Sequence, residues 1–343
     1  MQRVLCCLFI LLLLCSAGCD ILGTSGDSPQ PLCVGLLTDG DSVEDGGINQ
    51  EIWNSLQQLK SEILGLEIQY RVPGQDGGYS ECAAFLAERG CTLIICADGS
   101  MADTIVKVAQ ENPRCTFAVM DCADLEQDNV VCLGYAMEDA VYLAGYTAGK
   151  ISTSERLGCV HGRLTGETER LLVSFMAGAK AANSDILLLR KNIVTQRDQG
   201  RQATEELVAN GADIVFHVDG TEDSAVLQGC RANGIRAVSV NAKQGSKYRD
   251  TVLAFAQKEI NAVVRRLVSE AMERTLKVGS QTLDFSNGGI SLTVNGDLVS
   301  EKIAASINNA RDRIAAGEIT IPTTFESLYE KYPELADNLS EKR

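Results

Sequence analysis

The feature that most constrains the fold of this chain is a regular alternation of short apolar runs with segments of helical periodicity. Most of the predicted strands are apolar runs with the composition of buried strands. The predicted strands cover residues 33–37, 67–72, 92–96, 115–120, 130–133, 157–160, 186–190, 214–218, 237–240, 252–255 and 290–294. Strands that alternate with helices at this spacing form βαβ units and a parallel sheet. Because 343 residues exceed a typical single domain, we predict an α/β fold with two lobes, each a parallel sheet flanked by helices.

A polar turn follows the first apolar run. Residues 38–47 read TDGDSVEDGG and lead into a predicted helix from Ile48. Ligands of parallel α/β sheets bind at the carboxyl ends of the strands, which is where this turn lies. The turn lacks the Gly-Lys-Ser/Thr of a phosphate loop, and its four carboxylates would repel an anion. Carboxylates accept hydrogen bonds, so the turn favours a neutral ligand rich in hydroxyl groups.

Hydrogen-bond acceptors recur directly after the predicted strands. They are Asp39, Asp98, Asp121, Asp219 and Asn241. One such residue is usually a helix cap or a turn residue. Five at the same topological position, drawn from both halves of the chain, predict that two facing lobes share one cleft. Tyr135 also ends a predicted strand and is a candidate for either packing or ligand contact.

The N-terminus is typical of an exported protein. Arg3 precedes twelve apolar residues, and small residues at 16–18 precede Cys19. This apolar core is too short to span a bilayer comfortably and has the layout of a signal peptide. The junction resembles a bacterial lipobox, which implies a lipoprotein signal peptide over residues 1–18 and acyl chains on Cys19; the alternative is an ordinary cleaved signal. Residues 19–31 are then a lipid-anchored tether, and Asp20 implies retention at the inner membrane, facing the periplasm.

The charge of the chain limits its partners. The formal net charge is −15 at pH 7, which argues against nucleic acid and against an electrostatic hold on anionic lipid. Acyl chains are therefore the expected contact with the membrane, and a stable anchor needs more than one.

The cysteines favour packing over a disulfide framework or a metal site. Nine of the thirteen follow Cys19, an odd number, and most lie in strand-like runs where Cys behaves as a small hydrophobic residue. Whether any of them pair is left open. There is no Cys-x-x-Cys pair after Cys19, and His161 and His217 are far apart in sequence, so we predict no metal site and no required cofactor.

Several segments also carry a family resemblance. They cover residues 34–56, 93–99, 138–145, 175–183, 210–216 and 252–258. These segments resemble the basic membrane protein family, the nucleoside-type substrate-binding lipoproteins of ABC importers. The resemblance implies a two-lobed periplasmic binding protein of type I that is not an enzyme, binds a small molecule and works with an ABC permease and ATPase.

The same resemblance implies several crossovers between the lobes. The expected N-terminal lobe comprises residues 32–138 and about 255–289, the C-terminal lobe comprises 139–254 and about 290–322, and 323–343 form a polar tail on the surface. Closure of two lobes around a hinge would mark the loaded state for the permease.

Carried over by position, four residues match the family's cleft: Asp39, Asn49, Asp121 and Lys258. The resemblance implies that Asp39 and Asp121 accept hydrogen bonds from a ring and that Lys258 donates. Asn241 lies where the family usually has an Asp that holds ribose hydroxyls.

Three departures bear on the ligand. Ile48 and Ser100 stand where the family has aromatic residues, and residues 194–198 contain none. Stacking contributes on the order of 1–3 kcal/mol per ring to the binding of a flat base, so the loss of these rings disfavours a purine nucleoside. The smaller side chains would also widen the space for the ligand ring. A larger flat ring with a polyol tail fits better, and the chain as a whole resembles the riboflavin-uptake lipoproteins of this family. We therefore expect riboflavin as the ligand, with a purine nucleoside as the alternative and phosphorylated forms binding worse.

Two other classes remain open. The segment 38–41 loosely resembles the Asp cluster of calcium-dependent nucleoside hydrolases but lacks their Pro-Gly and doubled Asp. The same segment fails as a calcium-binding hand, because Glu44 and Gln50 stand where Gly and a bidentate Glu are needed. A sensor that presents its ligand to a membrane receptor also fits the sequence.

Overall fold

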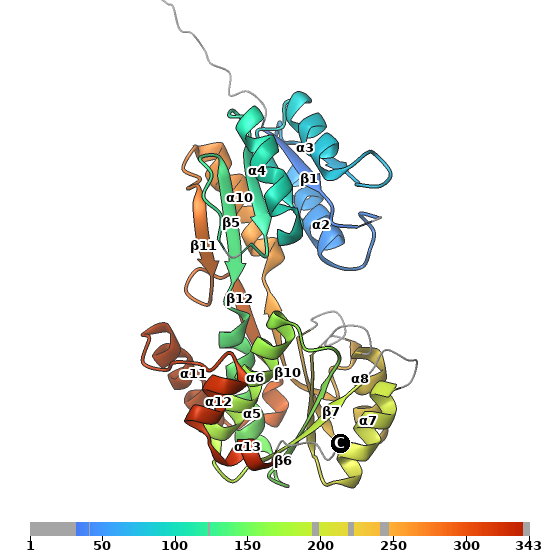
Figure 1. The fold of residues 1–343 in the computed structure, drawn as a ribbon, viewed down its shortest axis with the longest axis vertical. Helices are drawn as coiled ribbons and strands as arrows, with labels where there is room; N and C mark the ends of the chain where they lie inside the picture. The colour runs from blue at the N-terminus through green and yellow to red at the C-terminus, as the bar shows by residue number, and fades with distance from the viewer. Residues whose placement is uncertain are drawn as a thin grey trace, which may run out of the picture.

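The chain forms two α/β lobes joined end to end, each built on a six-stranded sheet (Figure 1). The computed structural model describes residues 32–40, 42–122, 124–193, 199–218, 223–240 and 247–338. The predicted arrangement of two sheets with flanking helices is confirmed.

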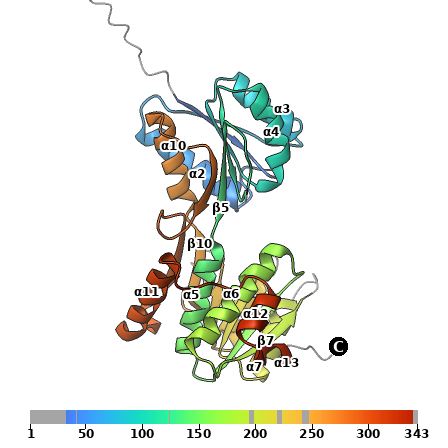
Figure 2. The same cartoon turned by 60° about the vertical axis from the view of Figure 1, so that its left-hand side comes forward.

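The first lobe has the strand order β11-β5-β4-β3-β1-β2, with all neighbouring strands parallel. Its strands are β1 Cys33–Leu37, β2 Glu67–Arg71, β3 Leu93–Cys96, β4 Thr116–Met120, β5 Val130–Tyr135 and β11 Gly279–Leu283. The helices are α2 Ile48–Glu62, α3 Tyr79–Glu88, α4 Ala102–Glu111 and α10 Ile260–Glu273, with the 3-10 turn η1 Gly99–Met101. Figure 2 shows α2 with α10 on one face of the sheet and α3 with α4 on the other. Helices on both faces explain why β1 and β3 are continuous apolar runs.

The second lobe has the strand order β12-β10-β9-β8-β6-β7, and β12 runs antiparallel to β10. Its strands are β6 Arg156–His161, β7 Leu187–Asn192, β8 Ile214–Val218, β9 Arg236–Ser239, β10 Val252–Lys258 and β12 Ile290–Val294. Its helices are α5 Met137–Ile151, α6 Gly166–Ala182, α7 Gln199–Ala209, α8 Asp223–Ala232, α11 Glu301–Ala315, α12 Phe325–Lys331 and α13 Glu334–Asn338, with the 3-10 turn η2 Gly296–Leu298.

Three segments of the described chain pass between the lobes. They are the connections from β5 to α5, from β10 to α10 and from β11 to β12. The first follows Tyr135 directly and the second follows Lys258, so two predicted site residues lie at the hinge.

Helices α5 and α6 approach each other more closely than side chains normally permit. A Cβ atom on Gly178 would collide with the main-chain oxygen of Tyr142, and one on Gly145 would collide with that of Phe175. The two glycines therefore let the helix backbones touch, and this contact fixes where α6 begins relative to the hinge.

The C-terminal segment corrects one prediction. We expected residues 323–343 to form a surface appendage, but Leu328 and Leu335 are buried and Lys180 of α6 pairs with Glu334 at 3.1 Å. Phe325 and Tyr329 also pack on the core beside α6. The segment is held because its apolar residues recur at helical spacing, so α12 and α13 cover α6 in the part of the tail that the structure describes.

The described cysteines only partly follow the packing prediction. Seven are free and buried, as expected. Cys122 and Cys132, however, form a disulfide, because Cys122 follows β4 and Cys132 lies in β5, its neighbour in the sheet.

Reduction of this disulfide is expected to lower the free energy of unfolding by about 2–3 kcal/mol, since the bond closes a short loop in the unfolded chain. Urea titration with and without dithiothreitol measures the difference. The double variant Cys122→Ala/Cys132→Ala is the control, because its unfolding should not respond to the reductant. A wild-type protein equally indifferent to reductant would contradict the prediction.

Candidate functional site

The carboxyl ends of β1, β3, β4 and β5 lie side by side along the edge of the first sheet that leads into the second lobe. Asp39, Asp98, Asp121 and Tyr135 stand at these four strand ends. Parallel strands with this order bring their last residues to one edge, which is the position that the sequence predicts for the site.

Asp39 is tied to the start of α2. The buried Asn49 donates from Nδ2 to Asp39 Oδ1 at 2.5 Å and to Asp45 Oδ2 at 2.8 Å, and its Oδ1 accepts from the Asp39 main-chain N–H at 3.2 Å. The preceding Ile48 packs against the apolar core. In this structure the hydrogen bonds of Asn49 therefore stabilise the conformation of the polar turn, and the packing of Ile48 fixes the start of α2 beside it.

The second strand end has the geometry of an ordinary cap. Asp98 Oδ1 accepts from the main-chain N–H of Ser100 at 2.8 Å and begins η1, while the Ser100 side chain is exposed. Between them, Gly99 lies so close to the main chain of Asp121 that any Cβ would collide with it. This close approach brings the ends of β3 and β4 together.

Three predicted residues make a compact group at the hinge. Lys258 Nζ donates to Asp121 Oδ1 at 2.6 Å and lies 5.2 Å from the centre of the Tyr135 ring. Asp121 has a left-handed backbone with φ of 52°, a strained conformation for a residue other than Gly that often marks a functional position. Burial raises the pKa of the Tyr135 phenol, so the side chain is uncharged at physiological pH and presents an aromatic ring to the site.

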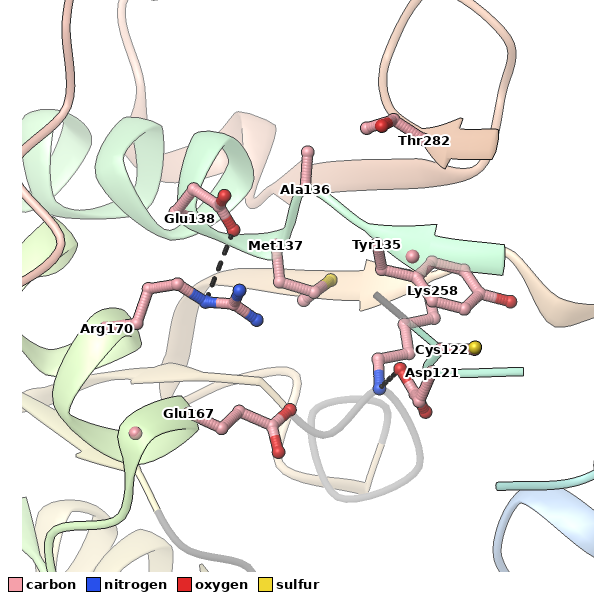
Figure 3. A pocket seen from close by; sticks show the side chains of 12 residues that line it. Asp121, Cys122, Tyr135, Ala136, Met137, Glu138, Glu167, Arg170, Lys258 and Thr282 are labelled. Atoms are coloured by element: carbon pink, nitrogen blue, oxygen red, sulfur yellow. Dashed lines mark hydrogen bonds and ion pairs between the residues drawn. The ribbon is translucent and has the colours of Figure 1, made fainter. Parts of the chain in front are cut away.

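This group lines a cavity of about 400 Å³ between the lobes (Figure 3). The lining residues are Asp121, Cys122, Gly134, Tyr135, Ala136, Met137, Glu138, Gly166, Glu167, Arg170, Lys258 and Thr282. Three of the predicted site residues therefore meet in one cavity, while Asp39, Ile48, Asn49, Asp98 and Ser100 stand outside its lining. Asp219, Asn241, Cys19 and residues 194–198 lie outside the described residues.

Sequence reasoning missed the contribution of α5 and α6. Arg170 Nε lies 3.6 Å from Glu138 Oε2, and neither atom has a hydrogen-bond partner among the described residues although both are buried. Glu167 lines the same cavity from the first turn of α6. A signal was available: both helices begin next to predicted strand ends with charged residues in the first turn.

A carboxyl group beside the cavity is sensitive to pH. Burial, with the negative charges of Glu138 and Asp284, raises the pKa of Asp139 to about 6. A folded-state pKa above that of the unfolded chain means that stability falls as the pH rises from about 4 to 6 and the folded carboxyl ionises.

Asp139→Asn is therefore expected to be more stable than wild type at pH 8 by about 1 kcal/mol. This value is less than the full pKa shift would give, because the group is only half-buried and water screens it. The advantage should disappear at pH 4, which urea titrations at the two pH values can test. An equal difference at both pH values would show that ionisation of Asp139 is not its cause.

The described part of the chain contains no cluster of three or more His, Cys, Asp or Glu side chains that could hold a metal ion. The candidate site instead offers hydrogen-bond donors and acceptors around a polar cavity. A helix long and apolar enough to cross a membrane is also absent from the described residues.

Two α/β lobes joined by three crossovers are the fold of the type I periplasmic binding proteins. The solute-binding protein of an ABC transporter system from Conexibacter woesei superposes with a TM-score of 0.70 over 85% of this chain and 99% of that chain, at 22% identity. A solute-binding protein from Aeropyrum pernix gives a TM-score of 0.70 at 18% identity, covering 90% of this chain and 98% of that one.

The chain belongs to the Bmp family, described as ABC transporter substrate-binding protein PnrA-like, whose sequence model matches residues 33–324. Among its relatives, the ABC transporter nucleoside-binding protein BmpA of Lactococcus lactis subsp. cremoris is 25% identical over 333 residues, covering 90% of this chain and 94% of the relative. Basic membrane protein A of Borreliella burgdorferi is 23% identical over 309 residues, covering 87% and 90%. The protein is thus a substrate-binding protein of an ABC transporter.

Proposed function

We propose that this protein binds riboflavin between its lobes and delivers it to an ABC permease and its ATPase. The observation that carries the proposal is the pair of Lys258 and Asp121, 2.6 Å apart beside the Tyr135 ring. A cationic donor next to an anionic acceptor matches a ring edge that presents a carbonyl next to an N–H. The isoalloxazine ring of riboflavin has such an edge, and Tyr135 offers an apolar face beside it.

The polyol tail suits the remaining lining. Riboflavin carries a chain of hydroxyl groups, and hydroxyls can both donate to carboxylates and accept from a guanidinium. Glu138, Glu167 and Arg170 supply these groups from the second-lobe side of the cavity. Closure about the three crossovers would bring the two sides onto one ligand.

A purine nucleoside is the second candidate. The Lactococcus relative is named as nucleoside-binding, and a purine with a carbonyl next to a ring N–H, as in inosine or guanosine, could meet the same donor and acceptor. Ile48 and Ser100 stand where the family resemblance implies aromatic residues that stack on a purine. Both lie outside the lining of this cavity, and Tyr135 is the one aromatic side chain among the described residues of that lining. A purine would therefore lack a second stacking ring, and this favours the larger flavin ring.

The two candidates differ in a direct binding experiment. Protein purified from a recombinant source is expected to be yellow, or to quench riboflavin fluorescence on titration after the ligand has been removed. Inosine, guanosine and adenosine are titrated in parallel by calorimetry. Saturable binding of a nucleoside without binding of riboflavin would refute the proposal and support the second candidate.

The anchor is part of the proposal. Acyl chains on Cys19 would hold the protein at the inner membrane on the periplasmic side. Mass spectrometry of the protein from membranes should find a diacylglyceryl group on Cys19, and Cys19→Ala should release the protein from the membrane fraction. Retention of that variant would contradict lipid anchoring.

A further inference from the structure

The lining of the interlobe cavity carries more negative than positive side chains. It contains three carboxylates, Asp121, Glu138 and Glu167, and two cations, Arg170 and Lys258. Lys258 pairs with Asp121 at 2.6 Å, and Arg170 pairs with Glu138 at 3.6 Å. Among the described residues Glu167 has no ion-pair partner, so it supplies the uncompensated negative charge of the cavity.

Glu167 stands where an anion would otherwise be favoured. It lies in the first turn of the seventeen-residue helix α6, beside Gly166, and its side chain is exposed. The amino end of a helix attracts phosphate and other anions. A carboxylate in this turn opposes that attraction, and Figure 3 shows the Glu167 side chain extending from α6 toward the side of the cavity that holds Asp121 and Lys258.

The other acidic groups at the carboxyl edge face elsewhere or are already bonded. Asp39 and Asp45 both accept hydrogen bonds from Asn49. Glu44 lines a separate cavity next to Trp53 and Tyr70. A hydrogen bond from the neutral Asn49 leaves the charges of Asp39 and Asp45 in place, but these two residues and Glu44 are absent from the lining of the interlobe cavity. Within that lining, Glu167 is therefore the carboxylate without a cationic partner among the described residues.

We infer that Glu167 is the residue that discriminates against phosphorylated forms of the ligand. This inference rests on the proposed function, in which the ring of riboflavin lies at Asp121, Lys258 and Tyr135. The polyol tail then points across the cavity toward α6. A phosphate on the end of that tail, as in flavin mononucleotide, carries close to two negative charges and comes within Coulomb range of Glu167.

The test is the ratio of two dissociation constants, that of flavin mononucleotide divided by that of riboflavin. In wild type this ratio is expected to exceed one and to fall as salt is added, because ions screen the repulsion. Glu167→Gln keeps the shape of the side chain and removes the charge. It should lower the ratio roughly three- to tenfold at low salt, as expected for a dianion several ångströms from a carboxylate in a partly hydrated site.

Glu169→Gln is the matched control. Glu169 lies in the same turn of α6, but its carboxylate accepts from the main-chain N–H of Phe325 on α12 and is absent from the cavity lining. The same loss of charge at this position should leave the ratio within about twofold of wild type, and circular dichroism verifies that both variants are folded.

The outcomes separate this inference from the proposed function. A ratio of one or less in wild type, a ratio that ignores salt, or an equal effect of the two substitutions would overturn the role of Glu167. If riboflavin does not bind but inosine does, the proposed ligand is wrong; the same ratio for inosine monophosphate and inosine then tests Glu167 on its own.

Discussion

Lys258→Met is expected to weaken riboflavin binding about 10- to 100-fold. Hydrogen bonds to charged groups contribute about 1.5–3 kcal/mol, and each 1.4 kcal/mol changes the dissociation constant tenfold. The substitution also leaves Asp121 without its partner 2.6 Å away, so the site loses a donor and gains an uncompensated charge. Titration of the ligand by quenching of its fluorescence measures the change.

Lys150→Met provides the matched control for this substitution. Lys150 lies in the last turn of α5, at the opposite end of the helix from the hinge, and its Nζ donates to the main-chain oxygen of Ala182. The same side-chain change there should leave riboflavin affinity within about twofold of wild type. Wild-type affinity in a folded Lys258→Met protein would remove the main support for the proposed site.

Gly178→Ala is expected to lower the free energy of unfolding by about 2–3 kcal/mol. Overpacking in a close-packed interior costs about 1–3 kcal/mol, and the value should lie high in that range because the added methyl meets main-chain atoms of Tyr142 and Tyr146, which cannot rotate away. Urea unfolding followed by circular dichroism measures the difference.

Gly166→Ala tests whether any methyl added to α6 has the same effect. Gly166 begins the same helix, and a Cβ there meets no atom within 4 Å. Its unfolding free energy should stay within about 1 kcal/mol of wild type. Equal effects of the two substitutions would mean that the contact between α5 and α6 is not what makes Gly178 sensitive.

Most of the fold was predictable because its central strands are apolar runs. The five residues of β1 and the four of β3 are all buried, and burial on both faces leaves a continuous hydrophobic signal. β11 was missed for the opposite reason. Its sequence GSQTL is mostly polar and alternates in exposure, because it is an edge strand at the end of the sheet order.

The candidate site was predictable only in part. A position after a strand places a residue at the carboxyl edge of the sheet, but it does not tell whether the side chain lines the cavity. Asp121 and Asp98 both follow a predicted strand, yet Asp121 pairs with Lys258 in the cavity and Asp98 caps η1. Lys258 itself came from the family resemblance, and no local pattern marks it. The positions of Glu167 and Arg170 depend on where α6 lies, which the close approach of α5 and α6 at Gly145 and Gly178 sets.

The three crossovers between the lobes limit how the molecule can move. One flexible connection would let the lobes twist and tilt in any direction. Here three connections share any rotation among them and resist torsion; all of them leave from sheet strands, namely β5, β10 and β11, and the third ends in β12. This arrangement favours a reproducible swing of the lobes about one axis, so that a transporter that receives this protein would meet one loaded shape and not a range of orientations.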